Sequence, residues 1–265
     1  MSEQTLIKVK GIVTRAIQYK ENDKILTVLT AELGLISVYC YGAKSNKSKY
    51  LTSSRLFCYS EFVLARKKEY YYIKEADYIE AFFNISSDMD KLFLGQYFLE
   101  VANEVCVEGE RQDGFLRLLL NSLFALASDI CSPEKVKSVF ELRACAEMGV
   151  SPVTTECRKC GQHPDSILYF DVLNGDIVCP DCLLSENTGY SFEQKEIYGG
   201  SYCPVNPSVI VAMEYVVSSG IERVFSFSLT DEAFALFSAV CEKYLLNQVG
   251  RAFVTLDIYL GQIKK

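Results

Sequence analysis

The sequence predicts an α+β protein of more than one domain: a β-domain of five short strands, then an all-helical domain carrying an inserted four-cysteine zinc ribbon. Residues 5–80 contain short runs of β-branched and aromatic residues, whereas apolar residues recur with a helical period from Ser87 onward. Two Cys-x-x-Cys motifs interrupt the helical pattern. We expect one domain over residues 1–80 and a second over residues 81–265, with the ribbon at residues 151–187.

The first 80 residues predict five strands. Ile7 and Val9 alternate with lysines, and four more β-prone runs follow, at Lys24–Thr30, Leu35–Tyr41, Arg55–Arg66 and Tyr70–Ala76. Gly11 indicates a bulge or a close approach of two backbones. Short strands in close succession favour a small barrel or sandwich over a β-α-β unit.

Helices are predicted on both sides of the cysteine segment. Ser132-Pro133, Asn206-Pro207 and Thr230 are helix-start signals, and Gly149 and Gly220 are expected to end two of the helices. The pattern over residues 251–263 is ambiguous. The expected inward-facing residues are Met89, Leu92, Phe93, Tyr97, Leu99, Leu116, Leu119, Leu120, Leu123, Leu126, Val136, Phe140, Ala233, Phe237, Val240, Tyr244 and Leu245.

The four cysteines Cys157, Cys160, Cys179 and Cys182 have the spacing of a metal site. The two pairs flank 18 residues whose β-prone runs surround Asn174-Gly175, a dipeptide that favours a type I′ hairpin turn. Four cysteines fill a tetrahedral shell, so we expect one structural zinc ion rather than a catalytic one. His163 is then expected to be a solvated loop residue.

Disulfides or unrelated buried thiols are the alternative explanation for the four cysteines. No apolar signal segment opens the sequence, so we expect a reducing compartment, where disulfides are rare. The seven other cysteines lack ligand spacing and are expected to be small core residues.

Charge is unevenly distributed along the chain. Residues 1–80 hold 13 Lys/Arg against 9 Asp/Glu, a net charge of +4, whereas residues 81–265 carry −11. This division suggests one surface for polyanions and another for different partners. No apolar run approaches the roughly 20 residues needed to cross a bilayer, so we expect no membrane association.

The residue inventory gives little support to catalysis. One histidine makes a Ser-His-Asp or Cys-His system improbable, and neither G-x-x-x-x-G-K-[ST] nor G-x-G-x-x-G occurs. We therefore expect a protein that is not an enzyme. A metal-dependent nuclease without a recognised motif remains an alternative, as does a protein-interaction scaffold that acts through the acidic helical domain.

Nucleic-acid binding is the better-supported function. Cations neutralise phosphates, and exposed aromatic rings stack on unpaired bases. The competing explanation is that the aromatic residues of this region are core and the lysines only solvate loops. These aromatic residues are Tyr39, Tyr41, Tyr50, Phe57, Tyr59, Phe62, Tyr70, Tyr71 and Tyr72. The candidate DNA-binding residues are Lys8, Lys10, Arg15, Tyr41, Lys44, Lys47, Lys49, Arg55, Arg66, Lys67 and Lys68.

An ordered set of segments carries a family resemblance: Gly11–Val13, Tyr19–Thr30, Gly34–Ser37, Tyr41–Lys44, Tyr71–Ala76, Tyr97–Glu100, Phe140–Arg143, Gly149 with Pro152, Cys157–Gly161 and the second cysteine pair. Together these segments resemble the RecO family of bacterial recombination mediators, and the resemblance covers roughly residues 7–185. One departure from the family's pattern is Gly175-Asp176, where the family often has two glycines.

The resemblance implies that the β-domain is an OB-fold barrel. It further implies binding of single- and double-stranded DNA, annealing of complementary strands, and partnership with RecR and the single-strand-binding protein in loading the RecA recombinase. A cytoplasmic, nucleoid-associated location in a bacterium would follow. The family retains the four cysteines only in some members, and this chain has them.

Overall fold

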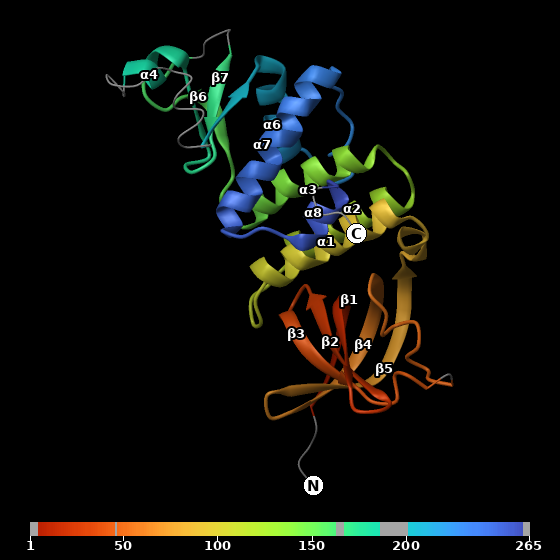
Figure 1. The fold of residues 1–265 in the computed structure, drawn as a ribbon. Coiled ribbons are helices and arrows are strands. Elements are labelled where there is room, and N and C mark those ends of the chain that lie inside the picture. Colours follow the sequence, from red (N-terminus) through yellow and green to blue (C-terminus); the bar gives the residue numbers. More distant parts are fainter. Residues whose placement is uncertain (1–4, 46, 163–166, 186–200, 262–265) are drawn as a thin grey trace. The chain divides into compact units, whose positions relative to one another are not determined.

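The computed structural model describes residues 5–45, 47–162, 167–185 and 201–261 of the chain (Figure 1). The chain forms two compact units. Unit 1 comprises residues 1–130 and 253–265, and unit 2 comprises residues 131–252. His163 lies outside the described residues.

Unit 1 contains a closed five-stranded barrel, coloured red to orange in Figure 1. The barrel closes in the order β1-β2-β3-β5-β4, with β3 and β5 parallel and the other pairs antiparallel. This is the Greek-key barrel of an OB-fold, and it confirms the predicted fold class. The strands are β1 (Leu6–Tyr19), β2 (Asp23–Thr30), β3 (Gly34–Cys40), β4 (Cys58–Lys67) and β5 (Tyr70–Ala81).

Alternation along the strands builds the barrel core. Val13, Leu26, Val28 and Ile36 point inward and are fully buried. The close approach expected at Gly11 is real, because a Cβ there would lie 2.6 Å from Val28 Cγ1. The bulge itself falls later, between Val13 and Arg15.

Two predicted strand boundaries were wrong. β4 begins at Cys58 rather than Arg55, because residues 51–57 form turns. β5 continues to Ala81, five residues past Ala76, because its second half still pairs with β4.

The helices of unit 1 pack on the barrel and on one another. The short 3-10 helix η1 (Phe83–Ser87) precedes α1 (Met89–Val105) and α2 (Asp113–Ala127). Residues 254–259, where the pattern was ambiguous, form the short helix α8 (Val254–Tyr259). α8 packs on α1 through a Tyr97–Phe253 ring contact at 5.4 Å between centroids. Met89, expected to face inward, is 50% exposed.

The described residues of unit 2 form three main helices and a small sheet. α3 (Pro133–Glu147), α6 (Pro207–Ser218) and α7 (Asp231–Val249) begin at caps formed by Ser132, Asn206 and Thr230, as the start signals predicted. The sheet has the order β6-β8-β7-β9. Its strands are β6 (Val153–Cys157), β7 (Leu168–Asp171), β8 (Asp176–Val178) and β9 (Tyr202–Val205), and the short helix α4 (Pro180–Ser185) follows β8. β9 lies beyond the predicted ribbon segment.

The hairpin between β7 and β8 forms, but not with the predicted type I′ turn. That turn needs positive φ at both central residues. Gly175 has φ 74°, whereas Asn174 is not among the positive-φ residues. The connection is instead a four-residue loop held by Asp171, whose carboxylate accepts hydrogen bonds from Leu173 N at 3.0 Å and Asn174 Nδ2 at 2.8 Å.

Among the residues that the structure describes, no helix is both long enough and apolar enough to cross a membrane.

Candidate nucleic-acid interface and metal centre

Five tyrosines gather on the outer surface of the barrel. On β3, Val38 and Cys40 point into the core, so Tyr39 points outward, and Tyr41 follows the strand's end. On β5, Tyr71 is buried and Tyr70 and Tyr72 point outward. The parallel pairing of Tyr39 with Tyr72 makes the two rows neighbours. We call Tyr19, Tyr39, Tyr41, Tyr70 and Tyr72 the tyrosine cluster.

Three rings of the tyrosine cluster are nearly parallel. The Tyr39 and Tyr72 centroids lie 5.3 Å apart at an interplanar angle of 22°, and those of Tyr41 and Tyr72 lie 5.9 Å apart at 15°. Tyr19 and Tyr70 meet Tyr39 edge-on, each with centroids 5.7 Å apart. Tyr41 is 52% exposed and Tyr70 is 49% exposed, so ring surface remains available to a ligand.

Two phenols of the tyrosine cluster, those of Tyr39 and Tyr41, have pKa values above their usual value and stay neutral at physiological pH. Partial desolvation and the neighbouring phenols raise the pKa of Tyr39, and partial desolvation, the Tyr72 phenol, the Asp23 carboxylate and the Tyr19 phenol raise the pKa of Tyr41. A neutral ring does not repel phosphate and retains a flat apolar face for a base.

Basic residues lie at both ends of the tyrosine cluster. Lys67 is the cross-strand partner of Tyr70, and Lys68 follows it in the β4–β5 turn. At the other end, Lys20 Nζ lies 5.2 Å from the Tyr19 ring centroid. Lys44 is three residues past Tyr41, and its backbone N donates to Asn22 O at 3.1 Å.

The remaining predicted basic residues are exposed, but only some are near the tyrosine cluster. Lys49 lies beside β5, donating to Lys74 O at 3.1 Å. Arg66 lies 5.6 Å from the Tyr71 ring centroid, near the end of β4. Lys47 and Arg15 are exposed on the β3–β4 loop and on β1.

Three predicted residues lie elsewhere on the barrel. Lys8 and Lys10 are on β1 where it pairs with β4, and Lys8 forms an ion pair with Glu61 at 2.9 Å. Arg55 lies over the Phe83 ring, 6.0 Å from its centroid. Phe83 follows the C-terminal end of β5, whereas Tyr70 is at the N-terminal end of that strand. Sequence spacing did not separate these residues from the lysines beside the tyrosines.

The aromatic residues of the region divide into core and surface groups. Phe62 and Tyr71 are buried in the barrel core, and Phe57 is buried next to Gly95 of α1. Tyr19, which the sequence did not single out, is half-buried and belongs to the surface group. The alternation of apolar and tyrosine residues at 38–41 was the signal that could have identified the outward pair.

The second candidate site is the cysteine cluster of unit 2. The sulfurs of Cys157, Cys160, Cys179 and Cys182 all lie within 4.8 Å of one another, as the spacing predicted. Cys160 Sγ and Cys179 Sγ are 3.8 Å apart, and Cys179 N donates to Cys157 Sγ at 3.3 Å. The cluster has the ligand type and number of a four-thiolate metal site.

The electrostatics of the four sulfurs favour a bound cation. Burial acts to raise the pKa of Cys157, but backbone N–H groups of Cys179, Cys160 and Lys159 lower it to about 6. The thiol of Cys182 shows the opposite effect, because its hydrogen bond with Cys179 and the other neighbouring sulfurs raise its pKa to about 12. Four thiolates this close repel one another, and a divalent cation would offset that repulsion.

The other seven cysteines behave as core residues, with one exception. Cys131 is half-buried, whereas Cys40, Cys58, Cys106, Cys145, Cys203 and Cys241 are buried. Burial raises the pKa of Cys106 to about 12 and that of Cys40 to about 11, so these thiols are poor nucleophiles at neutral pH.

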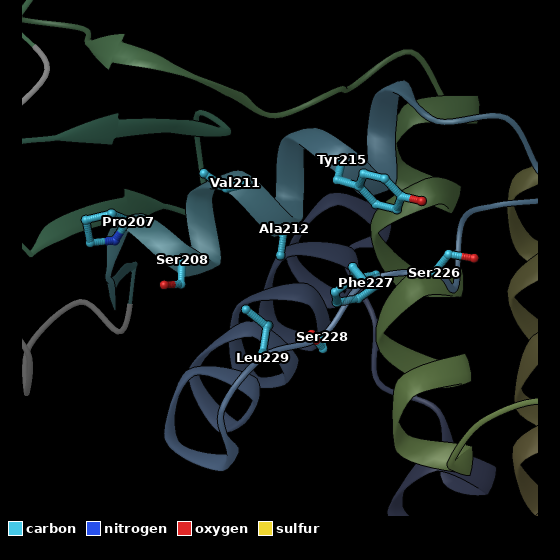
Figure 2. A pocket seen from close by; sticks show the side chains of 9 residues that line it. All are labelled: Pro207, Ser208, Val211, Ala212, Tyr215, Ser226, Phe227, Ser228 and Leu229. Atoms are coloured by element: carbon cyan, nitrogen blue, oxygen red, sulfur yellow. The ribbon is translucent and has the colours of Figure 1, made fainter.

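Unit 2 also has a surface pocket of about 470 Å³ (Figure 2). It is lined by one side of α6, from Pro207 to Tyr215, and by residues 226–229. These lining residues are apolar or hydroxyl-bearing and include no carboxylate, histidine or cysteine.

Comparison with known proteins matches two family models to successive parts of the chain. The family model described as "Recombination protein O N terminal" matches residues 1–82, and "Recombination protein O C terminal" matches residues 86–257. The DNA repair protein RecO of Acetivibrio thermocellus is 29% identical over 95% of each chain.

Two further relatives carry the same name. The DNA repair protein RecO of Caldicellulosiruptor saccharolyticus is 34% identical over 72% of this chain and 78% of its own. That of Alkaliphilus metalliredigens is 26% identical over 96% of this chain and 98% of its own. With both family models matched and the OB-fold barrel in place, the chain belongs to the RecO family of DNA repair proteins.

Proposed function

We propose that this protein is a non-enzymatic DNA-binding protein of recombinational repair, and that the tyrosine cluster with its flanking lysines is its single-strand site. The observation that carries the proposal is the row of outward-facing, nearly parallel rings on the OB-fold barrel, of which Tyr41 is exposed and Tyr39 and Tyr72 are half-buried, with Lys67, Lys68, Lys20 and Lys44 at its two ends. Rings of this kind stack on unpaired bases, and cations at the ends take the phosphates.

The finer activities are proposed from family membership. The protein would bind single- and double-stranded DNA and anneal complementary strands. With RecR, and through contact with the single-strand-binding protein, it would help to load the RecA recombinase. A flat stacking surface suits annealing, because stacked bases keep their pairing edges free for a complementary strand.

The metal of the cysteine cluster is proposed to be one structural zinc ion. Thiolates are soft ligands that select zinc over magnesium or calcium, and four of them fill the tetrahedral shell. When bound, zinc would supply charge compensation and a crosslink between the two cysteine pairs.

Tyr41→Ala and Tyr72→Ala test the stacking part of the proposal. Each removes a ring that would stack on a base, so affinity for a single strand should fall about 5- to 150-fold, the equivalent of about 1–3 kcal/mol. The salt dependence should not change, because the lysines that neutralise phosphates stay in place. Fluorescence anisotropy at several salt concentrations measures both quantities.

Tyr78→Ala is the matched control, because Tyr78 is 63% exposed on the second half of β5, away from the ring contacts of the tyrosine cluster. A second control is a strand with abasic positions, on which the wild-type protein should lose most of its advantage over Tyr41→Ala. Equal loss in Tyr78→Ala would remove the tyrosine cluster from the site.

Lysine replacements test the phosphate part. Lys67→Ala with Lys68→Ala should lower the slope of log affinity against log salt by about 0.7 for each phosphate of a single strand that is no longer neutralised. Lys8→Ala, at the β1–β4 pair, should leave the slope unchanged. The triple replacement of Lys44, Lys47 and Lys49 by Ala tests in the same way whether the β3–β4 loop neutralises phosphates.

An incubation with DNA and Mg²⁺ or Mn²⁺ separates a mediator from a nuclease. Complementary strands should anneal faster with the protein than without it, and their lengths should not change. Metal-dependent cleavage that copurifies with the protein would replace the proposed function with a nuclease.

A further inference from the structure

The Arg158 side chain joins parts of the cysteine ribbon that are distant in the sequence. Its Nη1 donates to Asp171 Oδ2 at 2.9 Å and to Asp176 Oδ1 at 3.0 Å. Its Nη2 lies 3.3 Å from the Tyr202 hydroxyl on β9. The Asp171 side chain is 2% exposed and that of Asp176 is 18% exposed, so both ion pairs are largely shielded from water.

These contacts connect the two cysteine pairs through protein atoms alone. Arg158 directly follows Cys157, and Asp176 precedes Cys179 by three residues on β8. The backbone N of Arg158 also donates to Ile177 O at 3.0 Å. Side chain and backbone of one residue therefore hold the first pair against the strand that leads into the second.

The partner carboxylates are themselves fixed. Asp171 accepts from Leu173 N and Asn174 Nδ2, which holds the β7–β8 loop around it. Nη1 of the guanidinium contacts both carboxylates while Nη2 contacts the Tyr202 hydroxyl, and the single nitrogen of a lysine ammonium cannot make both sets of contacts with the same geometry.

We propose that Arg158 is a positioning residue of the metal centre, which holds the four sulfurs together before the metal arrives. This inference rests on the proposed zinc site. A ligand set that is ordered beforehand loses less conformational entropy on binding, so the same four thiolates bind the metal more tightly. Arg158 touches the ligands only through the backbone that it orients.

Arg158→Lys tests this role because it keeps the positive charge but removes the planar group whose second nitrogen contacts Tyr202. The zinc dissociation constant, measured on the full chain by competition with a chromophoric chelator, should rise about 10- to 100-fold, the usual effect of losing an outer partner of a metal site. The Co²⁺ absorption spectrum at saturation should match the wild type, because the four thiolates are unchanged. Arg223→Lys, an exposed arginine of the same unit, should leave the dissociation constant unchanged.

Asp176→Asn is the second variant, since it removes the charge of the more exposed of the two carboxylates that Nη1 contacts and should weaken zinc binding to a smaller degree. A purely structural role predicts lower thermal stability with a wild-type dissociation constant in both variants, and that result would overturn the inference. A changed Co²⁺ spectrum would also overturn it, because the ligand set would then differ. Wild-type protein that takes up no zinc would instead overturn the proposed zinc site itself, and the role of Arg158 with it.

Discussion

Lys137 lies in the interior of unit 2 with its charge balanced by two carboxylates. Its Nζ lies 3.0 Å from Glu141 Oε1, one turn along α3, and 2.7 Å from Glu242 Oε2 on α7. The side chains of Lys137 and Glu141 are 2% and 0% exposed, and that of Glu242 is 25% exposed. Burial acts to lower the pKa of Lys137, but the two carboxylates outweigh it, so the pKa lies above its usual value.

Lys137→Met should destabilise unit 2 by about 3–5 kcal/mol, because it leaves Glu141 buried without a counter-charge. Denaturant unfolding of the metal-loaded protein measures the change. Adding Glu141→Leu to the same protein should recover most of the loss, since the buried charge is then gone and Glu242 can reach water. A double variant as unstable as the single one would show that packing, and not charge, sets the cost.

The pH dependence of this ion pair has a definite sign. A folded-state pKa above the unfolded value of 10.5 adds stability that is fully present below pH 10.5 and is lost as the pH rises through the folded pKa. The wild type should therefore lose stability above about pH 10.5 more steeply than the double variant. Parallel alkaline curves would contradict the assignment.

Residue exposure was partly predictable from the sequence. Every basic residue singled out for DNA binding is exposed, because lysine and arginine rarely enter a core. Lys137, which was not among those candidates, is a lysine that does enter the core. Nothing in its local sequence reveals its partner Glu242, which is more than a hundred residues away. Alternation predicts that Tyr39 and Tyr41 share a face, but only the pairing of β3 with β5 brings Tyr72 to them.

Among the elements, the β2–β3 turn is where the barrel and the helices of unit 1 join. Leu35 N donates to Val107 O at 3.2 Å, Gly109 N to Leu33 O at 3.0 Å, and Gln112 N to Ala31 O at 2.8 Å. The chain between α1 and α2 thus pairs with the turn as an added strand would. Gly34 has φ 67°, and a Cβ on it would lie 2.0 Å from Val107 O.

Gly34→Ala should therefore destabilise unit 1 strongly, and Gly42→Ala is its matched control. Both glycines have a left-handed backbone, so each alanine costs about 1–2 kcal/mol for conformation. Only Gly34→Ala adds a backbone collision, worth about 1–3 kcal/mol more, since nothing lies within 4 Å of a Cβ at Gly42. An equal loss of stability in the two variants, measured by thermal or denaturant unfolding, would mean that the backbone around Gly34 moves to accept the added Cβ without cost.

The ribbon gives the second element-scale prediction. Cys157→Ser removes one of the four ligands, so the metal content of purified protein should fall well below one ion per chain, with affinity reduced by more than the roughly 10- to 100-fold typical of an outer partner. Cys131→Ser, at a half-buried cysteine outside the cluster, should keep its metal. Folded yield should fall with metal content in the first variant only. Full stability without metal would contradict a structural ion.

Elements that depend on neighbouring residues in the sequence were predicted better than elements that depend on distant pairing. The helix starts at Ser132, Asn206 and Thr230 were found because a cap and its helix are neighbours in sequence. β9 was missed because its partner β7 lies some thirty residues earlier. The Asn174-Gly175 turn took another form because tertiary contacts act on it. Asp171 holds the loop through a hydrogen bond from Asn174, and a Cβ on Gly175 would lie only 2.2 Å from Tyr244 Oη.

At the scale of the whole molecule, the candidate DNA site and the metal centre belong to different compact units. The tyrosine cluster lies in unit 1 and the four cysteines lie in unit 2. The family models meet between residues 82 and 86, whereas unit 1 also contains α1, α2 and α8. A fragment of residues 1–80 would lack the partners of the β2–β3 turn, so tests of DNA binding belong on the intact chain.

Hydrogen exchange on that intact chain should therefore show two separate patterns of protection. Single-stranded DNA at 100 times its dissociation constant stabilises the part of the protein that binds it by about 2.7 kcal/mol. Amides of β3 and β5 should therefore exchange more slowly, while those of unit 2 do not change. Removing metal with a chelator should speed exchange in β6, β8 and α4 and leave the barrel as it was. A matched run with Tyr41→Ala under the same conditions should lose the strand's effect on β3 and β5. Protection by the strand that appears in unit 2 and spares the barrel would place the DNA site on the acidic helical part, and the tyrosine cluster would then need another ligand.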